Sequence, residues 1–367
     1  MFFGVFFLIA NCKDMSGALV NLVAKGAQDA FLTGTPEVSF FQSMYKRYSN
    51  FSQFPVELNT IGTAAASSTI SIPIQRKGDL LSYMWIDLGS GTVATELGMN
   101  TANPAVFRLY VGGQLVEEHD AFYASKLYSK FLANTGSKTT SGRNAASLDA
   151  STILPIHFSF CDDYALSLPL VALQYHDVEV RVQFNSGIPT TPKFYANYIQ
   201  LDSDERAKLA REPMEMLITQ VQRIQKDTNT KVDLSYFNHP VKALLWGSSD
   251  TGTLFTFADA KLTLNGVDVF DPMPQNYFSH VQTYHHSTNG SDLQAGATGE
   301  AAGLFMYSFA LKADRYQPCG TCNFSRLDNA ELKFGTTTND AQFNWFYAVN
   351  YNVFRIQNGL GGLAFSS

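Results

Sequence analysis

Val178-Glu-Val-Arg-Val-Gln-Phe184 shows the β-strand pattern of this sequence most clearly. Its apolar residues alternate strictly with Glu179, Arg181 and Gln183, which is the period of a β-strand with one face buried and the other in solvent. Similar short runs recur between clusters of Gly, Pro, Asn and Asp, at residues 69–74, 80–86, 107–111 and 216–222. Many short strands separated by turns predict an antiparallel sandwich or barrel.

One charged segment interrupts the strand pattern in the middle of the chain. Asp202-Ser-Asp-Glu205 has the spacing of a capping box, with Asp202 as the N-cap and Glu205 reaching back to its backbone. Good helix formers continue to Arg211, and Pro213 ends the run. We therefore predict a short helix that connects two β domains.

The two β domains are predicted to be copies of one fold. Leu109-Tyr-Val-Gly-Gly-Gln-Leu-Val116 resembles Leu262-Thr-Leu-Asn-Gly-Val-Asp-Val269, which begins 153 residues later. The other repeated segments follow in the same order: the aromatic pairs Phe122-Tyr123 and Tyr277-Phe278, then Phe158-Ser-Phe160 and Tyr307-Ser-Phe309, then Asp177-Val-Glu179 and Asp328-Asn-Ala-Glu331. An ordered set of matches at a nearly constant offset indicates an internal duplication.

The composition excludes several classes of protein. Hydrophobic residues make up 45% of the chain and charged residues only 16%, whereas a disordered chain combines low hydrophobicity with high charge. The net charge of −6 argues against a surface that binds nucleic acid directly, because such a surface normally carries a basic stripe. Since few charges remain to cover the surface, we expect part of it to be buried against other subunits.

The motifs of catalysis and metal binding are absent or incomplete. The sequence contains no phosphate-binding loop, nucleophile elbow, zinc-protease motif or calcium-binding loop. Cys319-Gly-Thr-Cys322 has the spacing of half a zinc site but no second pair completes it, and Cys12 and Cys161 are isolated. We therefore predict that the chain is not an enzyme and has no catalytic, cofactor-binding or metal-binding residues.

The histidines do not change this prediction. His285 and His286 are neighbours that would point to opposite faces of a strand, so only one of them could join His280 at a metal. His119-Asp120 and His176-Asp177 are interpreted as strand-end turns, because a catalytic dyad is formed in space rather than in sequence.

The N-terminus and three sequons carry the remaining signals. Residues 1–14 include an apolar run of ten residues, against the roughly 20 that span a membrane, and we interpret them as an N-terminal extension. The alternative is a short anchor that touches a membrane or a shell.

Candidate glycosylation sites are Asn289, in a loop-like stretch, and the weaker Asn50 and Asn323, which lie among aromatic residues and are expected to be buried.

Several segments, taken in order along the chain, carry a resemblance to a known family. They include Gly17-Ala-Leu-Val-Asn-Leu-Val-Ala-Lys-Gly-Ala-Gln-Asp29, Tyr45-Lys-Arg-Tyr-Ser-Asn-Phe51, Leu168-Pro-Leu-Val-Ala-Leu-Gln-Tyr-His-Asp-Val178, Phe237-Asn-His-Pro-Val-Lys242 and Asn350-Tyr-Asn-Val-Phe-Arg-Ile356. The chain from Met15 onward resembles the major capsid proteins of nucleocytoplasmic large DNA viruses, the group that includes phycodnaviruses, iridoviruses and mimiviruses.

The resemblance implies an all-β double jelly roll, which consists of two tandem eight-stranded antiparallel sandwiches with a short connector helix. The expected division is an N-terminal extension over 1–14, a first jelly roll over 15–202, the connector helix over 203–213 and a second jelly roll over 214–367.

The resemblance also implies a function. The chain is expected to be a structural capsid subunit, a late protein that forms homotrimeric, pseudo-hexagonal capsomers of an icosahedral shell. The alternative is a lower-copy minor capsid paralogue or a receptor-contacting protein with the same fold. The implied partners are the chain itself, minor capsid proteins and the internal viral membrane, without direct contact with nucleic acid. The implied location is the virion capsid, assembled in the host cytoplasm.

Overall fold

The structure is a computed structural model that describes residues 16–89, 91–98, 103–134, 151–184, 192–226, 230–247, 255–288, 303–338 and 345–366. The chain divides into two compact units, Met1–Tyr48 and Ser49–Ser367. In the first unit, the described part is the N-terminal segment, residues 16–48, with helices α1 (Ser16–Val23) and α2 (Ala30–Thr33). The predicted extension over 1–14 lies outside the described residues.

The second unit begins with a sandwich of two antiparallel sheets. Its strands are β1 (Phe51–Leu58), β2 (Thr69–Pro73), β3 (Leu80–Asp87), β4 (Val106–Val111), β5 (Gln114–Asp120), β6 (Ile153–Ile156), β7 (Leu168–Pro169), β8 (Val178–Gln183) and β9 (Lys193–Leu201). In the described residues one sheet has the order β1-β9-β3-β6, with β7 beside β3, and the other has the order β2-β8-β4-β5. The first strand therefore pairs with the last and the second with the next to last, which is the nested pairing of a jelly roll.

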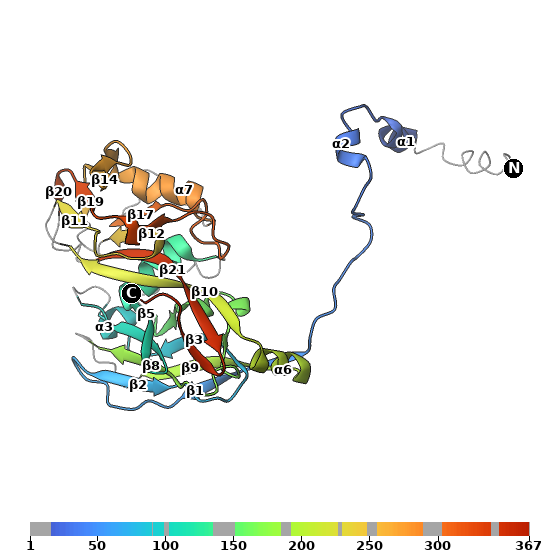
Figure 1. Ribbon diagram of the computed structural model, residues 1–367. Coiled ribbons are helices and arrows are strands. Elements are labelled where there is room, and N and C mark those ends of the chain that lie inside the picture. The colour runs from blue at the N-terminus through green and yellow to red at the C-terminus, as the bar shows by residue number, and fades with distance from the viewer. Residues whose placement is uncertain are drawn as a thin grey trace. The chain divides into compact units, whose positions relative to one another are not determined.

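A second sandwich follows along the chain (Figure 1). Its strands are β10 (Met214–Gln225), β11 (Lys231–Asp233), β12 (Pro240–Gly247), β13 (Thr256–Phe257), β14 (Asp259–Leu264), β15 (Val267–Asp268), β16 (Met273–Pro274), β17 (Leu304–Ser308), β18 (Cys322–Asn323), β19 (Ala330–Phe334), β20 (Thr337–Thr338), β21 (Trp345–Gln357) and β22 (Leu360–Leu363). Its sheets have the orders β10-β21-β12-β17 and β11-β19-β14-β15 among the residues described. This order repeats that of the first sandwich strand for strand, so the chain is a double jelly roll.

Short helices connect the strands. In the first sandwich they are α3 (Val93–Glu96), the π-helix η1 (Tyr123–Leu132), η2 (Ser159–Cys161) and η3 (Tyr164–Leu166). In the second they are the π-helix η4 (Tyr277–Val281), α7 (Gln282–His286) and η6 (Phe324–Arg326). In the part of the chain that the structure describes, none of the helices has the length and apolar character needed to cross a membrane.

The segments that repeat in the sequence occupy equivalent places in the two sandwiches. Residues 109–116 form the hairpin β4–β5, and residues 262–269 form the hairpin β14–β15. Both turns need two residues with positive φ, and these are Gly112 and Gly113 in the first copy and Asn265 and Gly266 in the second. The aromatic pairs that follow lie at the beginnings of η1 and η4.

The register of the sheets shows the same equivalence. Glu179 of β8 lies opposite Tyr110 of β4, and Glu331 of β19 lies opposite Thr263 of β14. Tyr110 and Thr263 are the second residues of the two repeated hairpin segments. The repeated acidic residues are therefore cross-strand partners of the same hairpin position, which a chance similarity would not produce.

Alternating burial explains how the strands form the two cores. In β8, Val178, Val180 and Val182 are buried, whereas Glu179 and Arg181 are partly exposed, as the period of two predicts. The second core is centred on aromatic rings, with Trp246 stacked on Phe346 at a centroid distance of 5.1 Å.

The connector helix is α6 (Ser203–Arg211), and it begins at the predicted N-cap. The carboxylate of Asp202 accepts a hydrogen bond from the N–H of Ser203 at 2.7 Å, rather than from the third helical residue as in a capping box. Oε2 of Glu205 has no hydrogen-bond partner among the residues that the structure describes. The helix is instead held to the first sandwich by Arg206, whose Nε lies 2.9 Å from Oδ1 of the buried Asp79.

Candidate functional site

The cysteine and histidine motifs do not come together as a site. Cys319 and Cys322 are partly buried free thiols, and Sγ of Cys319 exchanges hydrogen bonds of 3.2 Å with the backbone N–H and carbonyl of Lys312. Cys161 is also a free thiol, whose pKa is raised by burial, and Cys12 lies outside the described residues. Among the residues that the structure describes, no group of three or more His, Cys, Asp or Glu side chains could hold a metal ion.

The two adjacent histidines lie on a helix rather than on the strand that we considered. His285 and His286 are the last residues of α7, and Nδ1 of His286 lies 2.8 Å from the carbonyl oxygen of Ala310. This contact joins α7 to the loop after β17, which is a structural role.

The expected burial of two of the sequons is wrong. Asn50 and Asn323 are both exposed. Asn323 accepts a hydrogen bond from the N–H of Ser325 and caps η6, while the neighbouring Phe324 is buried in the core. Adjacent residues in an extended chain point to opposite sides, so an aromatic neighbour does not bury an asparagine. Asn289 lies outside the described residues.

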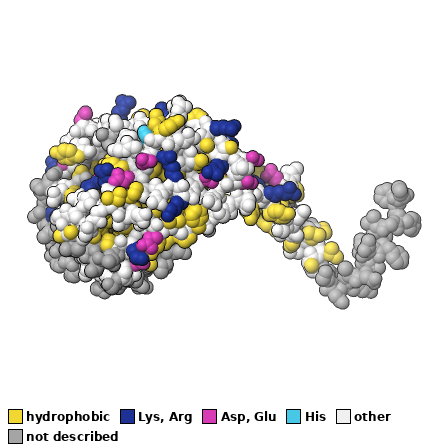
Figure 2. Space-filling view, turned by 90° about the horizontal axis from the view of Figure 1, so that it is seen from below, with side chains coloured by type: hydrophobic (Ala, Val, Ile, Leu, Met, Phe, Trp, Pro, Cys, Tyr) yellow, Lys and Arg dark blue, Asp and Glu magenta, His cyan; other side chains and the backbone are white. Residues whose placement is uncertain are grey.

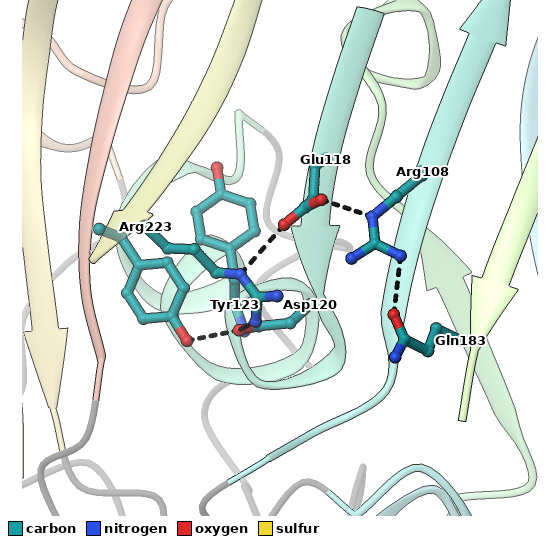
Figure 3. Close-up of polar contacts among 7 residues, drawn as sticks. Arg108, Glu118, Asp120, Tyr123, Gln183 and Arg223 are labelled. Carbon is teal, nitrogen blue, oxygen red and sulfur yellow. Dashed lines mark hydrogen bonds and ion pairs between the residues drawn. The ribbon is translucent and has the colours of Figure 1, made fainter. Parts of the chain in front are cut away.

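A buried cluster of charged side chains joins the two sandwiches (Figure 3). Its centre is Asp120, the last residue of β5, which is fully buried. Its carboxylate accepts hydrogen bonds from the Tyr347 hydroxyl at 2.7 Å, from Nη1 of Arg223 at 3.2 Å and from the N–H of Tyr123 at 2.8 Å. Tyr347 belongs to β21 and Arg223 to β10, so one carboxylate of the first sandwich holds two strands of the second.

Glu118 extends the cluster across β5 and β4. Its carboxylate lies 2.6 Å from Nε of Arg108 and 3.2 Å from Nε of Arg223. Burial lowers the pKa of Arg223, but the carboxylates of Asp120 and Glu118 outweigh it and hold that pKa above its ordinary value. The guanidinium of Arg223 also lies 4.5 Å from the centroid of the Trp345 ring. The arginine therefore stays charged and is bound on several sides.

Two titratable residues flank this cluster in β5. Glu117 is buried and accepts hydrogen bonds from the hydroxyl and, at 2.8 Å, the N–H of Ser159. Burial raises its pKa to about 8. Burial and the positive charge of Arg223 lower the pKa of His119 to about 3, and its ring packs between Phe107 and Phe158.

An apolar contact accompanies the charges. Helix η1 lies against the outer face of the sheet β10-β21-β12-β17, where Leu127 and Phe131 pack on Leu245, Met306 and Tyr347 with no exposed surface. We call this the inter-sandwich contact. Its apolar area and its buried ion pairs hold the two jelly rolls as one body, and the geometry suits a rigid building unit.

The sequence did not reveal this cluster. Asp120 and Arg223 are 103 positions apart. Asp120 belongs to the pair His119-Asp120, which we interpreted as a strand-end turn, and Arg223 lies in no motif. The nearest signal was the acidic stretch after the repeated hairpin, at Glu117 and Glu118, which by itself is typical of a solvated turn.

A second candidate for binding is the N-terminal segment. It exposes large apolar side chains along its length, including Leu22, Phe31, Phe40 and Phe41. Figure 2 shows hydrophobic side chains along the segment, and charged side chains of both signs among apolar ones on the visible face of the sandwiches. Exposed apolar side chains of this kind are typical of an interaction surface.

Comparisons with known proteins agree with this architecture. The family described as major capsid protein N-terminus matches residues 39–209, and the family described as large eukaryotic DNA virus major capsid protein matches residues 205–362. Among solved structures, the PBCV-1 virus capsid matches with a TM-score of 0.74 at 28% identity, covering 90% of this chain and all of that one. The Faustovirus major capsid protein has the same fold, with a TM-score of 0.65 at 11% identity over 93% of this chain and 96% of that one.

Two curated relatives match from end to end. The chain is 33% identical to the major capsid protein of Pyramimonas orientalis virus and 30% identical to that of Paramecium bursaria Chlorella virus 1. Each alignment covers 96% of this chain and 100% of the relative. The chain therefore belongs to the family of large eukaryotic DNA virus major capsid proteins.

Proposed function

We propose that this chain is the structural subunit of a large DNA virus shell and that it forms homotrimers with a pseudo-hexagonal outline. The observation that carries the proposal is the end-to-end match with the major capsid protein of Pyramimonas orientalis virus. The repeated strand order supports the trimer, because three chains with two similar sandwiches each supply the six similar sides of a hexagonal outline. The relatives are named for a structural role, and we propose no catalytic activity.

The proposed domain division follows the resemblance: an extension over 1–14, a first jelly-roll domain over 15–202, the connector over 203–213 and a second jelly roll over 214–367. In the first domain the sandwich itself begins at β1, after the N-terminal segment. The two family matches support it, since one ends at residue 209 and the other begins at residue 205, inside α6.

The proposed partners are copies of the chain in the trimer and in neighbouring trimers, minor capsid proteins and the viral membrane beneath the shell. Major capsid proteins are components of the virion, and we propose assembly in the host cytoplasm late in infection. Asn289, Asn50 and Asn323 are proposed glycosylation sites, which mass spectrometry of peptides from virions would test.

Size-exclusion chromatography with light scattering tests the trimer. The expected mass is three times the 40.5 kDa of one chain, and electron micrographs of the peak should show a hexagonal outline. A monomer at micromolar concentration that is also absent from the shell of virions would overturn the proposal. The number of copies of the chain in a purified virion distinguishes the two candidate roles. A major shell protein is present in many copies, and a minor paralogue in few.

A further inference from the structure

Two hairpins of the second sandwich turn at the same dipeptide with the same backbone. The hairpin β14–β15 turns at Asn265-Gly266 and the hairpin β21–β22 at Asn358-Gly359, and the strand register leaves two residues in each loop. The φ angles are 49° and 80° in the first turn and 54° and 80° in the second. Two positive φ angles are what a type I′ turn requires. The two turns are therefore a matched pair, in which any difference in chemistry comes from their surroundings.

The carboxamide of the asparagine is held in one turn and not in the other. Oδ1 of Asn265 accepts hydrogen bonds from the N–H groups of Asp328 and Asn329, at 3.0 and 3.1 Å. The N–H of Asn265 also donates to the carbonyl oxygen of Asn329 at 2.7 Å. Asn358 is exposed, and among the residues that the structure describes none makes a hydrogen bond with its side chain.

An Asn-Gly pair places a nucleophile and an electrophile on adjacent residues. The backbone nitrogen of the glycine loses its proton to hydroxide and attacks Cγ of the asparagine. The bond from Cγ to the side-chain nitrogen breaks, and that nitrogen takes up a proton from water and leaves as ammonia. Water then opens the resulting succinimide ring at one of its two carbonyls and leaves an aspartate or an isoaspartate. Glycine hinders the attack least, because it has no Cβ.

The nucleophile is available in both turns. The hydrogen bond across a two-residue turn joins the residues that flank it, so the N–H of the glycine is not used. The carbonyl oxygen of Gly359 accepts a hydrogen bond from the N–H of Tyr175 at 3.0 Å, but this contact involves neither reacting atom. The difference lies in the electrophile, because Cγ of Asn265 reaches its nucleophile only after two hydrogen bonds to Oδ1 break.

We propose that Asn358 is a site of spontaneous deamidation and isoaspartate formation in the folded protein, and that Asn265 is protected from this reaction. Two hydrogen bonds that must break before the attack correspond to a rate that is at least about fivefold lower at Asn265. The inference does not depend on the proposed trimer or shell, since it uses only contacts within one chain.

The modification would act on a contact between the two sandwiches. The hairpin β21–β22 lies against the loop between β7 and β8, where Tyr175 donates to Gly359 and Nδ1 of His176 lies 2.8 Å from the carbonyl oxygen of Gly361. An isoaspartate adds one methylene to the backbone of the turn and displaces Gly359 from Tyr175. We expect the loss of this hydrogen bond to lower the thermal midpoint by about 2 °C.

The test compares the two sites in the folded and in the unfolded protein. The purified full chain is stored at mildly alkaline pH with and without concentrated urea, and fragmentation of its peptides in a mass spectrometer locates each converted asparagine. In the folded protein we expect Asn358 to react at least about fivefold faster than Asn265. In urea the two rates should be similar, because neither side chain is then held and each is followed by glycine. The third Asn-Gly pair, at Asn289, lies outside the described residues and is followed separately.

Two matched variants test the effect on stability. Stored Asn358→Gln should keep the thermal midpoint of fresh protein, because the longer side chain does not form the five-membered ring. Stored Asn265→Gln should lose as much as stored wild type. An equal loss in stored Asn358→Gln would show that Asn358 is not its source.

The rates themselves decide the proposal. Equal rates at Asn265 and Asn358 in the folded protein, or a faster reaction at Asn265, would overturn it. A difference that persists unchanged in urea would also overturn it, because the hydrogen bonds of the fold would then not be the cause.

Discussion

Asp120 concentrates the connection between the two jelly rolls in one carboxylate. It is completely buried, and its three hydrogen-bond donors come from η1, β10 and β21. A buried ion pair contributes little net stability compared with an apolar pair, but the loss of one partner leaves the other charge buried. The cluster should therefore be far more sensitive to substitution than ion pairs on the surface.

We expect Asp120→Ala to lower the free energy of unfolding by about 3–5 kcal/mol, because the partly buried Arg223 loses one of its two carboxylates. The matched control is Asp177→Ala, which removes a 3.4 Å ion pair with Arg76 in which the Asp177 side chain is fully exposed. The control should cost far less, because solvent screens an ion pair at a fully exposed side chain. Urea unfolding of the three proteins measures the difference, and equal losses for both substitutions would contradict a structural role for the cluster.

Glu117 predicts a dependence of stability on pH. Its pKa of about 8 in the folded protein lies above the ordinary value of 4.5. The folded protein then holds a proton that the unfolded chain has lost, so stability falls as the pH rises between these two values. Glu117→Gln cannot ionise and should lose about 1 kcal/mol less than wild type between about pH 7 and pH 8.

Urea unfolding at the two pH values measures this difference. His119 does not interfere with this measurement. Its pKa is about 3 in the folded protein and 6.5 in a free chain, so it changes stability mainly between these two pH values, below the range that is compared. Parallel losses for wild type and Glu117→Gln would show that the Glu117 carboxyl is ionised in the folded protein at neutral pH.

At the scale of elements, the hairpin β4–β5 shows how a local signal and a tertiary contact combine. Gly112 and Gly113 both have positive φ, of 57° and 82°, which a side chain strains. A Cβ on Gly113 would meet no atom within 4 Å, whereas a Cβ on Gly112 would lie 2.6 Å from the His176 ring. That ring is held by the carbonyl oxygen of Gly361 in β22, 2.8 Å from Nδ1.

We therefore expect Gly113→Ala to destabilise by about 1 kcal/mol through backbone strain alone. Gly112→Ala should cost at least about 1 kcal/mol more, because the His176 ring must move and lose its contact with β22. Thermal unfolding of the two variants tests the order, and His176→Ala in the Gly112→Ala background should recover the difference. If the two glycine variants have the same midpoint, the His176 contact does not restrict this turn.

The elements were the part of the fold that the sequence predicted best. The strands at 69–74, 80–86, 107–111 and 178–184 were found within one or two residues, because alternation and turn residues are local properties. The N-cap Asp202 was predicted correctly for the same reason. The hydrogen-bond donor to its carboxylate was not, because the donor is the N–H of Ser203 and not that of Glu205. The predicted burial of Asn50 and Asn323 was wrong, because it was inferred from their aromatic neighbours in the sequence.

In the whole molecule, the N-terminal segment belongs to one compact unit and the two sandwiches together form the other. The segment exposes Lys25, Lys46 and Arg47 together with its apolar side chains. A chain segment with little buried surface opens at little cost in free energy, so a protease reaches it first.

We expect limited trypsin digestion of the isolated protein to cleave first after these three residues. The remaining core should begin after Arg47 and keep the thermal midpoint of the intact chain. Mass spectrometry of the core and calorimetry check both points. First cleavage within the sandwiches, or a core with a lower midpoint, would show that the segment contributes to their stability.

The all-β class, the duplication, the connector helix and the family could all be predicted from the amino-acid sequence. Each of these depends on the order and spacing of residues along the chain, and an ordered repeat or a strict alternation is visible without a structure. The jelly-roll pairing of first strand with last was implied by the resemblance rather than by the local patterns.

The positions of buried charge and of exposed surface depend instead on how the two sandwiches pack. Asp120 and Arg223 look like ordinary charged residues until two sandwiches bring them within 3.2 Å. Leu245, on the outer face of its sheet, is completely buried because η1 of the first sandwich packs on it. The burial of a residue depends on which distant parts of the chain pack on it. The local sequence pattern around the residue contains no information about those contacts.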